Sequence, residues 1–454
     1  MNQEQKYSKL FDYDFQAPEL LDLSVVYKKL DKIPLLRTST VGRIKQVTGS
    51  IIQAQLVNSN IGEICYICPE GHDVVKAQIV GFNDEDVFLT PFDRLEAIGP
   101  KTKIINRGET LSIQVGNNLL GRVVDSLGMP IDDKGKLDCP IKYPVKKNSP
   151  NAMKRRRITN QLPVGVKAID FFLPLGEGQR VGVFSTAGVG KSSLLGIIAR
   201  NSTAEINVIA LVGERGREVL EFLEDNLGEA GLRKSVVVVA TSDDTPLRRI
   251  MAAYTATTIA EYFRDQGKKV MLLMDSVTRF ARALREIALS IGESPARQGF
   301  PPSVFSTLPE IFERAGNSAK GSITALYTVL LSSEIIEDPL GEEVRAILDG
   351  HFFLSSKLAQ MQHYPALDLL RSVSRVMDKI VTKEHLELAK KLVSHWSVYE
   401  ENRDLISIGA YKKGSDPEID AALELRSKLE NFLRQDYHIA ESFEKTLKLA
   451  KKLV

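Results

Sequence analysis

A glycine-rich turn between an apolar run and a helical stretch could hold the phosphates of a nucleotide. The run Ser185-Thr186-Ala187-Gly188-Val189-Gly190-Lys191-Ser192 follows the strand candidate 181–184 and precedes the helical stretch 193–199. Glycines let the backbone curl so that successive N–H groups face phosphate oxygens, and the helix N-terminus adds a positive dipole end. The residues expected around the phosphates are Thr186, Ala187, Gly188, Val189, Gly190, Lys191, Ser192 and Ser193.

Two of these residues have specific roles in this interpretation. Lys191 would reach the β- and γ-phosphates, and the Ser192 hydroxyl would ligate Mg²⁺. Ser185 stands where the general motif has glycine. The motif by itself therefore leaves one alternative open, which is a strand-to-helix turn that merely tolerates glycine.

A second apolar run, 270–275, ends in a carboxylate that could hold the same metal ion. Val270-Met271-Leu272-Leu273-Met274-Asp275 has the form of the Walker B strand, in which the aspartate binds Mg²⁺, here through a bound water. An aspartate at a strand end can instead cap the following helix. The phosphate-binding turn upstream favours the metal ligand.

Hydrolysis also needs a group that orients water and a cation that stabilises developing charge. Glu214 follows the apolar run 208–212 and would lie at the ligand-binding edge of a parallel sheet, where it could act as general base. An ion pair of Glu214 with Arg215 or Arg217 is an equal alternative on the residues alone. Arg375 is a candidate cation, but its spacing does not place it near a phosphate.

The bulk composition is that of a folded protein of two or three domains. The chain has 454 residues, of which 43% are hydrophobic and 26% charged, with a net charge of +2. This balance gives no basic field for nucleic acid, and the basic cluster 154–157 is expected to be a solvated linker. Three cysteines indicate a reducing compartment, with Cys65 and Cys68 as packed thiols rather than zinc ligands.

Four regions follow one another along the chain. Residues 1–35 are expected to be a variable arm, and 36–100 a small antiparallel β-barrel of short strands divided by turns. Residues 101–378 alternate apolar strands and helices, which predicts an α/β P-loop core with a parallel sheet. The strands expected there are Val181–Phe184, Val208–Val212, Val236–Thr241, Val270–Asp275 and Ile323–Leu331, with helices at Glu218–Leu227 and Leu247–Asp265.

Residues 379–454 are expected to form a helical domain. Asp416-Pro417-Glu418 is typical of a helix start, with Asp416 as N-cap. An apolar face follows at helical spacing: Ala422, Leu425, Leu429, Phe432 and Leu433. Ordinary helix packing explains this face and the basic amphipathic tail 445–454; a docking surface for a partner is the alternative. No apolar run reaches the ~18–20 residues that span a bilayer, and no signal-like core begins the chain.

The combined motifs resemble those of the type III protein export ATPases of the flagellum and the injectisome, which are relatives of the catalytic subunits of rotary ATP synthases. The resemblance covers nearly all of residues 37–435. Its most specific segments are Gly213-Glu214-Arg215-Gly216-Arg217-Glu218, Ala260-Glu261-Tyr262-Phe263-Arg264-Asp265-Gln266-Gly267, Met274-Asp275-Ser276-Val277-Thr278-Arg279-Phe280-Ala281, Gly299-Phe300-Pro301-Pro302-Ser303-Val304-Phe305 and Gly409-Ala410-Tyr411-Lys412-Lys413-Gly414-Ser415-Asp416-Pro417.

The resemblance implies a RecA-like fold and a role for individual residues. Lys191 and Glu214 become catalytic, Ser192 and Asp275 metal ligands, and Arg215 a nucleotide contact. Tyr364 resembles the aromatic residue that packs against adenine. Arg375, after the run Pro365 to Ser374, resembles an arginine finger given to the neighbouring subunit, which requires a homohexameric ring.

The same resemblance implies ATP and Mg²⁺ as ligands and protein export as the task. The expected partners are copies of this chain, a central stalk protein, a stator-like regulator and chaperone–substrate complexes, with the membrane export gate engaged indirectly and no nucleic acid. The expected location is the cytoplasm, peripheral to the inner membrane. The resemblance does not separate the flagellar from the injectisome system.

Three rival functions share parts of this sequence pattern. A true rotary ATP synthase or vacuolar-type subunit shares most motifs, but the segments 277–280 and 299–303 favour export. An RNA-translocating hexamer of the Rho type needs basic and aromatic residues interleaved in its N-terminal fold, which 37–98 lack. A scaffold that does not hydrolyse ATP is disfavoured because Lys191, Glu214, Asp275 and Arg375 occur together.

Overall fold

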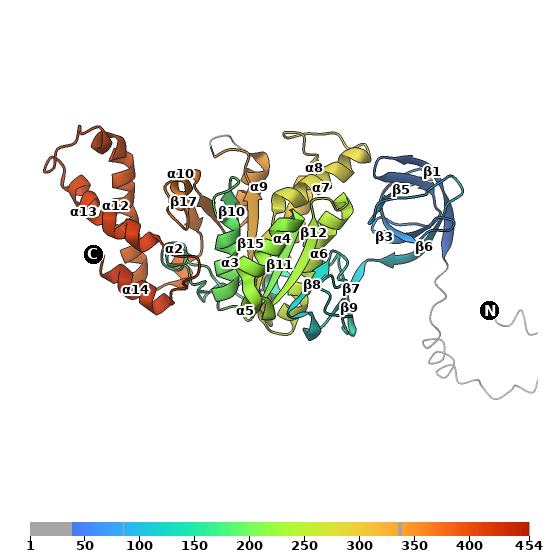
Figure 1. Cartoon of the computed structure of the whole chain (residues 1–454), viewed down its shortest axis with the longest axis horizontal. Helices are drawn as coiled ribbons and strands as arrows, with labels where there is room; N and C mark the ends of the chain where they lie inside the picture. The colour runs from blue at the N-terminus through green and yellow to red at the C-terminus, as the bar shows by residue number, and fades with distance from the viewer. Residues whose placement is uncertain (1–38, 85, 335–337, 454) are drawn as a thin grey trace, which may run out of the picture.

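The computed structural model describes residues 39–84, 86–334 and 338–453, so the expected arm 1–35 lies outside it. Figure 1 shows three regions in a row: a barrel at the N-terminal end, a sheet with helices on both faces in the middle, and a helical region at the C-terminal end. This arrangement is the expected one: a β-barrel, an α/β core and a helical domain.

The N-terminal region is a closed antiparallel barrel with the strand order β1-β2-β5-β4-β3-β6. Its strands are β1 (Thr40–Thr48), β2 (Ile51–Gln55), β3 (Glu63–Cys68), β4 (Val75–Asn83), β5 (Asp86–Pro91) and β6 (Lys103–Thr110). Inward residues such as Ile52, Ile67 and Leu89 are fully buried. The expected boundary at residue 100 is misplaced, because β6 lies beyond it and closes the barrel by pairing with both β1 and β3.

The core sheet has the order β17-β16-β10-β15-β13-β11-β12-β8, with the short β14 paired to β15. All of its pairings are parallel except those of β14 and β17. The strands are β8 (Arg122–Asp125), β10 (Arg180–Ser185), β11 (Ile206–Glu214), β12 (Ser235–Thr241), β13 (Lys269–Asp275), β14 (Gly316–Asn317), β15 (Ser322–Leu330), β16 (Gly350–Leu354) and β17 (Leu367–Ser374). The five expected strands are present within one or two residues; β8, β16 and β17 were not expected.

Helices cover both faces of this sheet, and the two faces have separate cores. Along β11, Val208, Ala210 and Val212 face one core, whereas Ile209 and Leu211 face the other, as the two-residue period of a strand requires. The first core includes α6 (Pro246–Asp265), α7 (Val277–Ser290), α8 (Pro302–Phe312) and α9 (Pro339–Ile347). The second includes α2 (Lys167–Phe172), α3 (Lys191–Asn201) and the segment 216–233, in which α4 (Gly216–Glu221), a π-helical turn (Phe222–Leu227) and α5 (Gly228–Arg233) follow one another.

The C-terminal helices begin at the residues that the sequence predicts. In α13 (Pro417–Leu433) the Asp416 side chain accepts hydrogen bonds from the N–H groups of Glu418 and Ile419, and Pro417 occupies the first turn. The expected apolar face is buried, and it joins the second core together with α12 (Lys383–Ser407) and α14 (Phe443–Lys451). In the described part of the chain, no helix combines the length and hydrophobicity that a membrane crossing requires.

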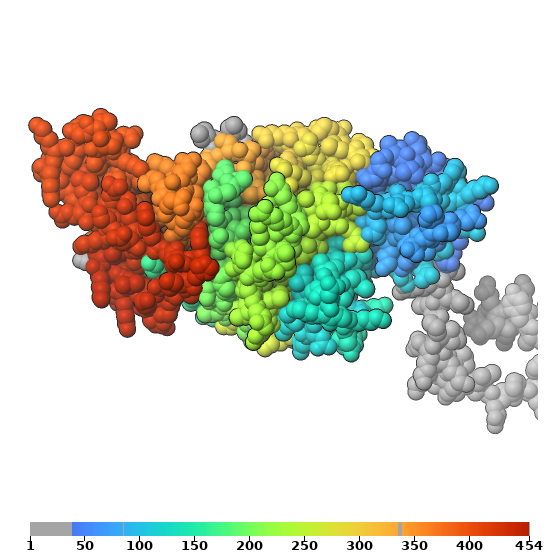
Figure 2. Space-filling view, viewed as in Figure 1, coloured from blue at the N-terminus to red at the C-terminus, as the bar shows by residue number. Residues whose placement is uncertain are grey.

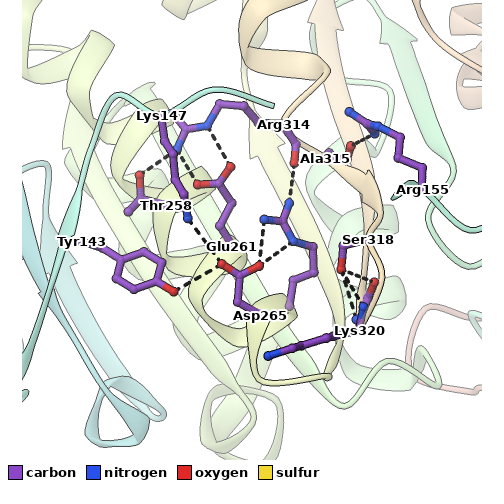
Figure 3. A network of polar contacts seen from close by, with 12 residues as sticks. Tyr143, Lys147, Arg155, Thr258, Glu261, Asp265, Arg314, Ala315, Ser318 and Lys320 are labelled. Carbon is purple, nitrogen blue, oxygen red and sulfur yellow. Dashed lines mark hydrogen bonds and ion pairs between the residues drawn. The ribbon is translucent and has the colours of Figure 1, made fainter. Parts of the chain in front are cut away.

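Two arginines of the basic cluster 154–157 bond to the core, although Lys154, Arg156 and Arg157 are exposed, as expected of a solvated segment. Arg155 donates to the carbonyl oxygen of Ala315 at 2.8 Å, and Arg156 donates to that of Ser318 at 3.0 Å. Arg314 forms a buried ion pair with Glu261 at 2.7 Å (Figure 3). It also donates to the Val145 carbonyl at 2.8 Å. The basic cluster therefore satisfies backbone carbonyls, which the sequence pattern did not indicate.

Small elements and the thiols complete the description. The strands β7 (Ser112–Val115) and β9 (Ile141–Pro144) pair beside the core. The remaining short helical elements of the described chain are α10 (Ser356–Gln360), α11 (Met377–Ile380) and two 3-10 turns (Asn117–Leu119 and Ala152–Lys154). Cys65 and Cys139 are buried free thiols and Cys68 is a partly buried one.

Candidate active site

The glycine-rich turn connects the C-terminal end of β10 to the first residue of α3. Gly188 and Gly190 have φ angles of +79° and +84°, which residues with a side chain rarely adopt. Lys191 is the first residue of α3, so the N-terminus of this helix opens onto the turn. Backbone N–H groups and the helix dipole thus converge on one place, which is the geometry of a phosphate-binding loop.

Lys191 lies between two buried carboxylates that come from neighbouring strands. Its ammonium group is hydrogen bonded to Asp275 at the end of β13, and it lies 3.9 Å from Oε1 of Glu214 at the end of β11. Asp275 also accepts a hydrogen bond of 2.8 Å from the hydroxyl of Thr328 on β15. Three residues that are distant in sequence therefore meet at the carboxyl edge of the sheet, as predicted.

The Glu214 carboxyl group is poised to exchange a proton near neutral pH. Burial and the negative charge of Asp275 raise its pKa to about 7, while the Lys191 ammonium acts in the opposite direction. A hydrogen bond with Glu214 lowers the pKa of the more exposed Glu218. Oε1 of Glu214 has no hydrogen-bond partner within the described residues, so it is available to a ligand.

The structure does not show the non-catalytic alternatives that the sequence left open for these two carboxylates, an ion pair of Glu214 and a helix cap by Asp275. Arg215 pairs with Glu218 at 3.4 Å and Arg217 with Glu221 at 2.6 Å, and both arginines are largely exposed. Neither is an ion-pair partner of Glu214. The cap of α7 is Ser276, whose side chain accepts from the Arg279 N–H, so Asp275 is not the helix cap.

The donor set fits a hard divalent cation. Ser192 is exposed on the first turn of α3, and the Asp275 carboxylate lies beside Lys191 of the same turn. Hydroxyl and carboxylate oxygens are the ligands that Mg²⁺ prefers. Ser192 and Asp275 are accordingly the residues that would hold it, as the sequence predicts.

Two tyrosines cover the turn from the side of the C-terminal region. The rings of Tyr364 and Tyr437 have centroids 5.5 Å apart with 50° between their planes. A Cβ atom placed on Gly190 would lie 2.6 Å from the Tyr437 hydroxyl and 3.3 Å from the Tyr364 ring. The tyrosines border a groove of about 500 Å³ between Gln362 and His438. Tyr364 was predicted, but Tyr437 was not, because no local motif marks it.

Arg375 lies at the amino-terminal ends of the parallel strands, whereas the phosphate-binding turn lies at their carboxyl-terminal ends. It follows β17, which runs antiparallel to β16, and Ser374 pairs with Gly350 at the start of β16. His351 is in register with Gly182, near the start of β10, whereas Lys191 follows the end of β10. Since a strand rises ~3.3 Å per residue, Arg375 is more than ~10 Å along the strands from the turn. Its guanidinium donates to the Arg345 carbonyl at 3.2 Å.

Comparisons with known proteins agree with this geometry. Residues 165–374 match the ATP synthase alpha/beta family, nucleotide-binding domain, and residues 381–450 match the T3SS EscN ATPase C-terminal domain. The chain is 48% identical to the flagellum-specific ATP synthase of Bacillus subtilis, with 87% of this chain and 90% of the relative covered. It is 46% identical to the type 3 secretion system ATPase of Xanthomonas euvesicatoria, with 90% and 92% covered.

A solved structure has the same fold along nearly its whole length. The assembled ATPase EscN of enteropathogenic E. coli, in complex with its central stalk EscO, superimposes with a TM-score of 0.84 at 44% identity, covering 91% of this chain and 99% of EscN. The expected resemblance is thereby confirmed. The phosphate-binding turn with its two carboxylates, and identity of this extent with such relatives, show that the chain is an ATPase of the flagellum-specific and type 3 secretion system family.

Proposed function

We propose that this ATPase hydrolyses MgATP at an active site shared between adjacent copies of the chain, in a homohexameric ring that drives protein export. The position of Arg375 is the observation that supports a site shared between subunits. The residues that bind phosphate lie at the carboxyl edge of the sheet, whereas the only arginine that the family resemblance assigns as a finger lies at the other edge. A finger in that position can serve only the site of a neighbour.

Within one subunit, each group has a distinct task. The N–H groups of the turn 186–190 and the Lys191 ammonium bind the triphosphate, and Lys191 leaves its carboxylate partners to do so. Glu214, in its ionised form, accepts a proton from the attacking water. A magnesium ion held by Ser192 and Asp275 would neutralise charge on the phosphate oxygens. Arg215 at the start of α4 is exposed and would reach the nucleotide from the side of Glu214.

The adenine base is assigned to the groove beside the turn. Tyr364 and Tyr437 present ring faces there, and aromatic rings stack on bases whatever the base's hydrogen-bonding groups. The Tyr437 hydroxyl is buried without a partner in the described structure, and burial raises its pKa, so it stays neutral. Tyr437 is therefore an uncharged wall of the base site, and the Tyr364 ring forms the wall beside it.

The export task and the partners follow from the relatives. EscN is an assembled ATPase with a central stalk, which supports a ring of this chain around a stalk protein. We extend the proposal to a stator-like regulator and to chaperone–substrate complexes, from which hydrolysis would release cargo toward a membrane export gate. Such a machine works in the cytoplasm, peripheral to the inner membrane. The four regions with boundaries near 35, 110 and 378 would be its arm, crown barrel, motor and helical domain.

Mixing two inactive variants tests the shared site. Arg375→Ala lacks the finger and Lys191→Ala lacks the phosphate ligand, and each alone should lose about 10³-fold or more of the ATPase rate. Mixed rings contain interfaces in which an intact Arg375 faces an intact Lys191. Partial recovery of ATPase activity is expected. No recovery, in rings shown by mass spectrometry to be mixed, would count against a finger acting between subunits.

A rotary synthase subunit is the closest rival function. It would assemble with a second, related chain rather than with itself. Size-exclusion chromatography with light scattering of the single purified chain, in MgATP, separates the two: a six-copy particle supports the export ATPase, and strict monomers that hydrolyse ATP at the full rate would exclude the shared site.

A further inference from the structure

The segment between α13 and α14 connects the C-terminal helices to the nucleotide site. Residues 434–442 run across the edge of the core beside the phosphate-binding turn, and Figure 2 shows C-terminal (red) atoms packed against the green part of the core. Tyr437 lies in the middle of this segment. Its carbonyl accepts a hydrogen bond of 2.6 Å from Arg200, which belongs to the helix that the turn begins.

Gln435 is the residue that fixes this segment in place. Its backbone N–H donates to the carbonyl oxygen of Tyr364 at 2.9 Å. Its side-chain Oε1 accepts from the Lys167 N–H at 2.8 Å, and its Nε2 donates to the carbonyl oxygens of Gly165 at 2.7 Å and Ile439 at 2.8 Å. One partly buried side chain thus joins the core loop 165–167, the segment that carries Tyr437 and the backbone of Tyr364.

The core loop that receives Gln435 is itself rigid. The carboxyl group of Asp170, fully buried, accepts hydrogen bonds from the N–H groups of Val164 and Gly165 at 2.8 and 2.9 Å. Gly165 has a φ of +77°, and a Cβ there would lie 2.9 Å from Asn201 and 3.3 Å from Ala440. The loop therefore offers its carbonyl and N–H groups to Gln435 at fixed positions, which is what an anchor requires.

We propose that Gln435 is a positioning residue for the adenine site: it sets the separation and tilt of Tyr364 and Tyr437 without touching the nucleotide. The inference rests on the proposed function of these tyrosines. Its four hydrogen bonds hold the backbone of Tyr364 on one side and the chain two residues before Tyr437 on the other. Loss of the side-chain bonds frees the segment 435–439, so the tyrosines no longer form one preorganised groove.

This role predicts a specific separation of kinetic effects. The triphosphate binds to the turn and Lys191, which Gln435 does not contact, whereas the base binds to the tyrosines. Replacement of Gln435 should therefore weaken binding of ATP but not of a ligand that lacks a base. A general disturbance of the fold would weaken both.

The experiment compares Gln435→Leu, which removes all three side-chain hydrogen bonds, with Gln435→Glu, which keeps an acceptor for the Lys167 N–H. Gln78→Leu is the matched control, because Gln78 is a buried glutamine of the barrel that donates to the Gly62 carbonyl at 3.1 Å. For each variant, the KM for ATP, kcat at saturation, the inhibition constant of magnesium tripolyphosphate and the melting temperature are measured on the full chain.

For Gln435→Leu we expect a KM for ATP that is about 5- to 50-fold higher, with kcat and the inhibition constant of tripolyphosphate each within about twofold of wild type. Gln435→Glu should have an intermediate KM, and Gln78→Leu should lower the melting temperature only. An unchanged KM, or equal weakening of ATP and tripolyphosphate binding, would overturn the role. If Gln435→Leu does not fold, Gln435→Glu carries the same test.

The design also separates this inference from the proposed function. A wild-type chain that hydrolyses no ATP in any oligomeric state would refute the proposed function. Calorimetric titration of ATP and tripolyphosphate into wild type and Gln435→Glu still measures the base-dependent difference in that case, and its absence would refute the role of Gln435.

Discussion

The two ends of this molecule flank the same sheet, yet they differ in what they contribute to it. The barrel rests on the start of α6, where Arg248 forms ion pairs with Asp93 of the barrel side and Asp125 of the core. Thr245 and Arg248 also donate to the Phe92 carbonyl. None of these described contacts reaches Lys191, Glu214 or Asp275. The barrel is thus attached to the α/β core away from these three residues.

The C-terminal region, by contrast, brings a side chain against the phosphate-binding turn. Tyr437 lies over Gly190, and Gln435 and Lys167 join the segment 434–439 to the core. The helices α12, α13 and α14 share one apolar core with α3, which begins at the phosphate-binding turn. We therefore expect a displacement of these helices to change the proposed nucleotide site, and a displacement of the barrel to leave it unchanged.

The largest effect is expected at Glu214, which belongs to neither end. Glu214→Gln should bind ATP with a KM within about threefold of wild type but lose about 10²–10⁴-fold in kcat, since the proposed general base is gone. The wild-type kcat/KM should rise with pH through about 7, because only the ionised carboxylate accepts a proton and its pKa is raised to about 7. This rise of kcat/KM with pH should be absent in Glu214→Gln. A lost affinity for ATP would instead assign Glu214 a structural role.

The same pKa has a consequence for stability that provides an independent check. The folded protein favours the neutral carboxyl group of Glu214. The resulting gain in unfolding free energy, measured relative to Glu214→Gln, should be fully present below about pH 4.5 and should be lost as the pH rises through about 7. Denaturant unfolding of both proteins at several pH values measures the difference. A difference that grows with pH would contradict the assigned direction.

The next effect is expected at Tyr437, on the C-terminal side. Tyr437→Ala should raise the KM for ATP about 5- to 100-fold with little change in kcat, because stacking on a base contributes about 1–3 kcal/mol. Tyr437→Phe should keep the KM within about twofold and should not lower the melting temperature, since the buried hydroxyl has no partner in the described structure. A Phe variant as impaired as the Ala variant would mean that the hydroxyl, not the ring, binds the ligand.

Site residues that belong to a local sequence pattern could be predicted, whereas residues that reach the site from distant parts of the chain could not. Glu214 and Asp275 each end an apolar strand, and Lys191 follows the glycine-rich turn after a third. Parallel strands bring their carboxyl ends together, so local patterns suffice. Tyr437 and Gln435 reach the site only through the packing of α13 and α14, and the residues around them carry no pattern that indicates it. Their contribution becomes visible only when the tertiary contacts are known.

The strands β8, β16 and β17 were not predicted because they also lack a clear local pattern. β8 and β16 have four and five residues, and β17 alternates buried and exposed positions irregularly at an edge of the sheet. Strands this short give too few residues for a period to be recognised. The barrel boundary was missed because β6 begins after a turn-rich stretch, 92–102, that looks like a domain junction; only its pairing with β1 and β3 assigns it to the barrel.

A pair of leucine variants compares the two ends directly. Leu89 in the barrel and Leu429 on α13 are each at most 1% exposed, so Leu89→Ala and Leu429→Ala should both cost about 2–5 kcal/mol of unfolding free energy. Only Leu429→Ala should also raise the KM for ATP, by about two- to fivefold at a temperature where both proteins are folded. Steady-state kinetics with denaturant unfolding measure both quantities. Equal KM changes in the two variants would remove the distinction between the ends.

The smallest effect is expected at the contact of barrel and core. Asp93→Asn removes one of the two carboxylates paired with Arg248, whereas Asp125 keeps the other, and Asp93 is half exposed. The loss should be at most about 1 kcal/mol, should vanish in high salt, and should leave the KM for ATP unchanged. The exposed pair Lys451–Glu384 between α14 and α12 offers a matched variant, Glu384→Gln, at the other end. A several-fold KM change in Asp93→Asn but not in Glu384→Gln would mean that the barrel contact, rather than the C-terminal helices, controls the nucleotide site.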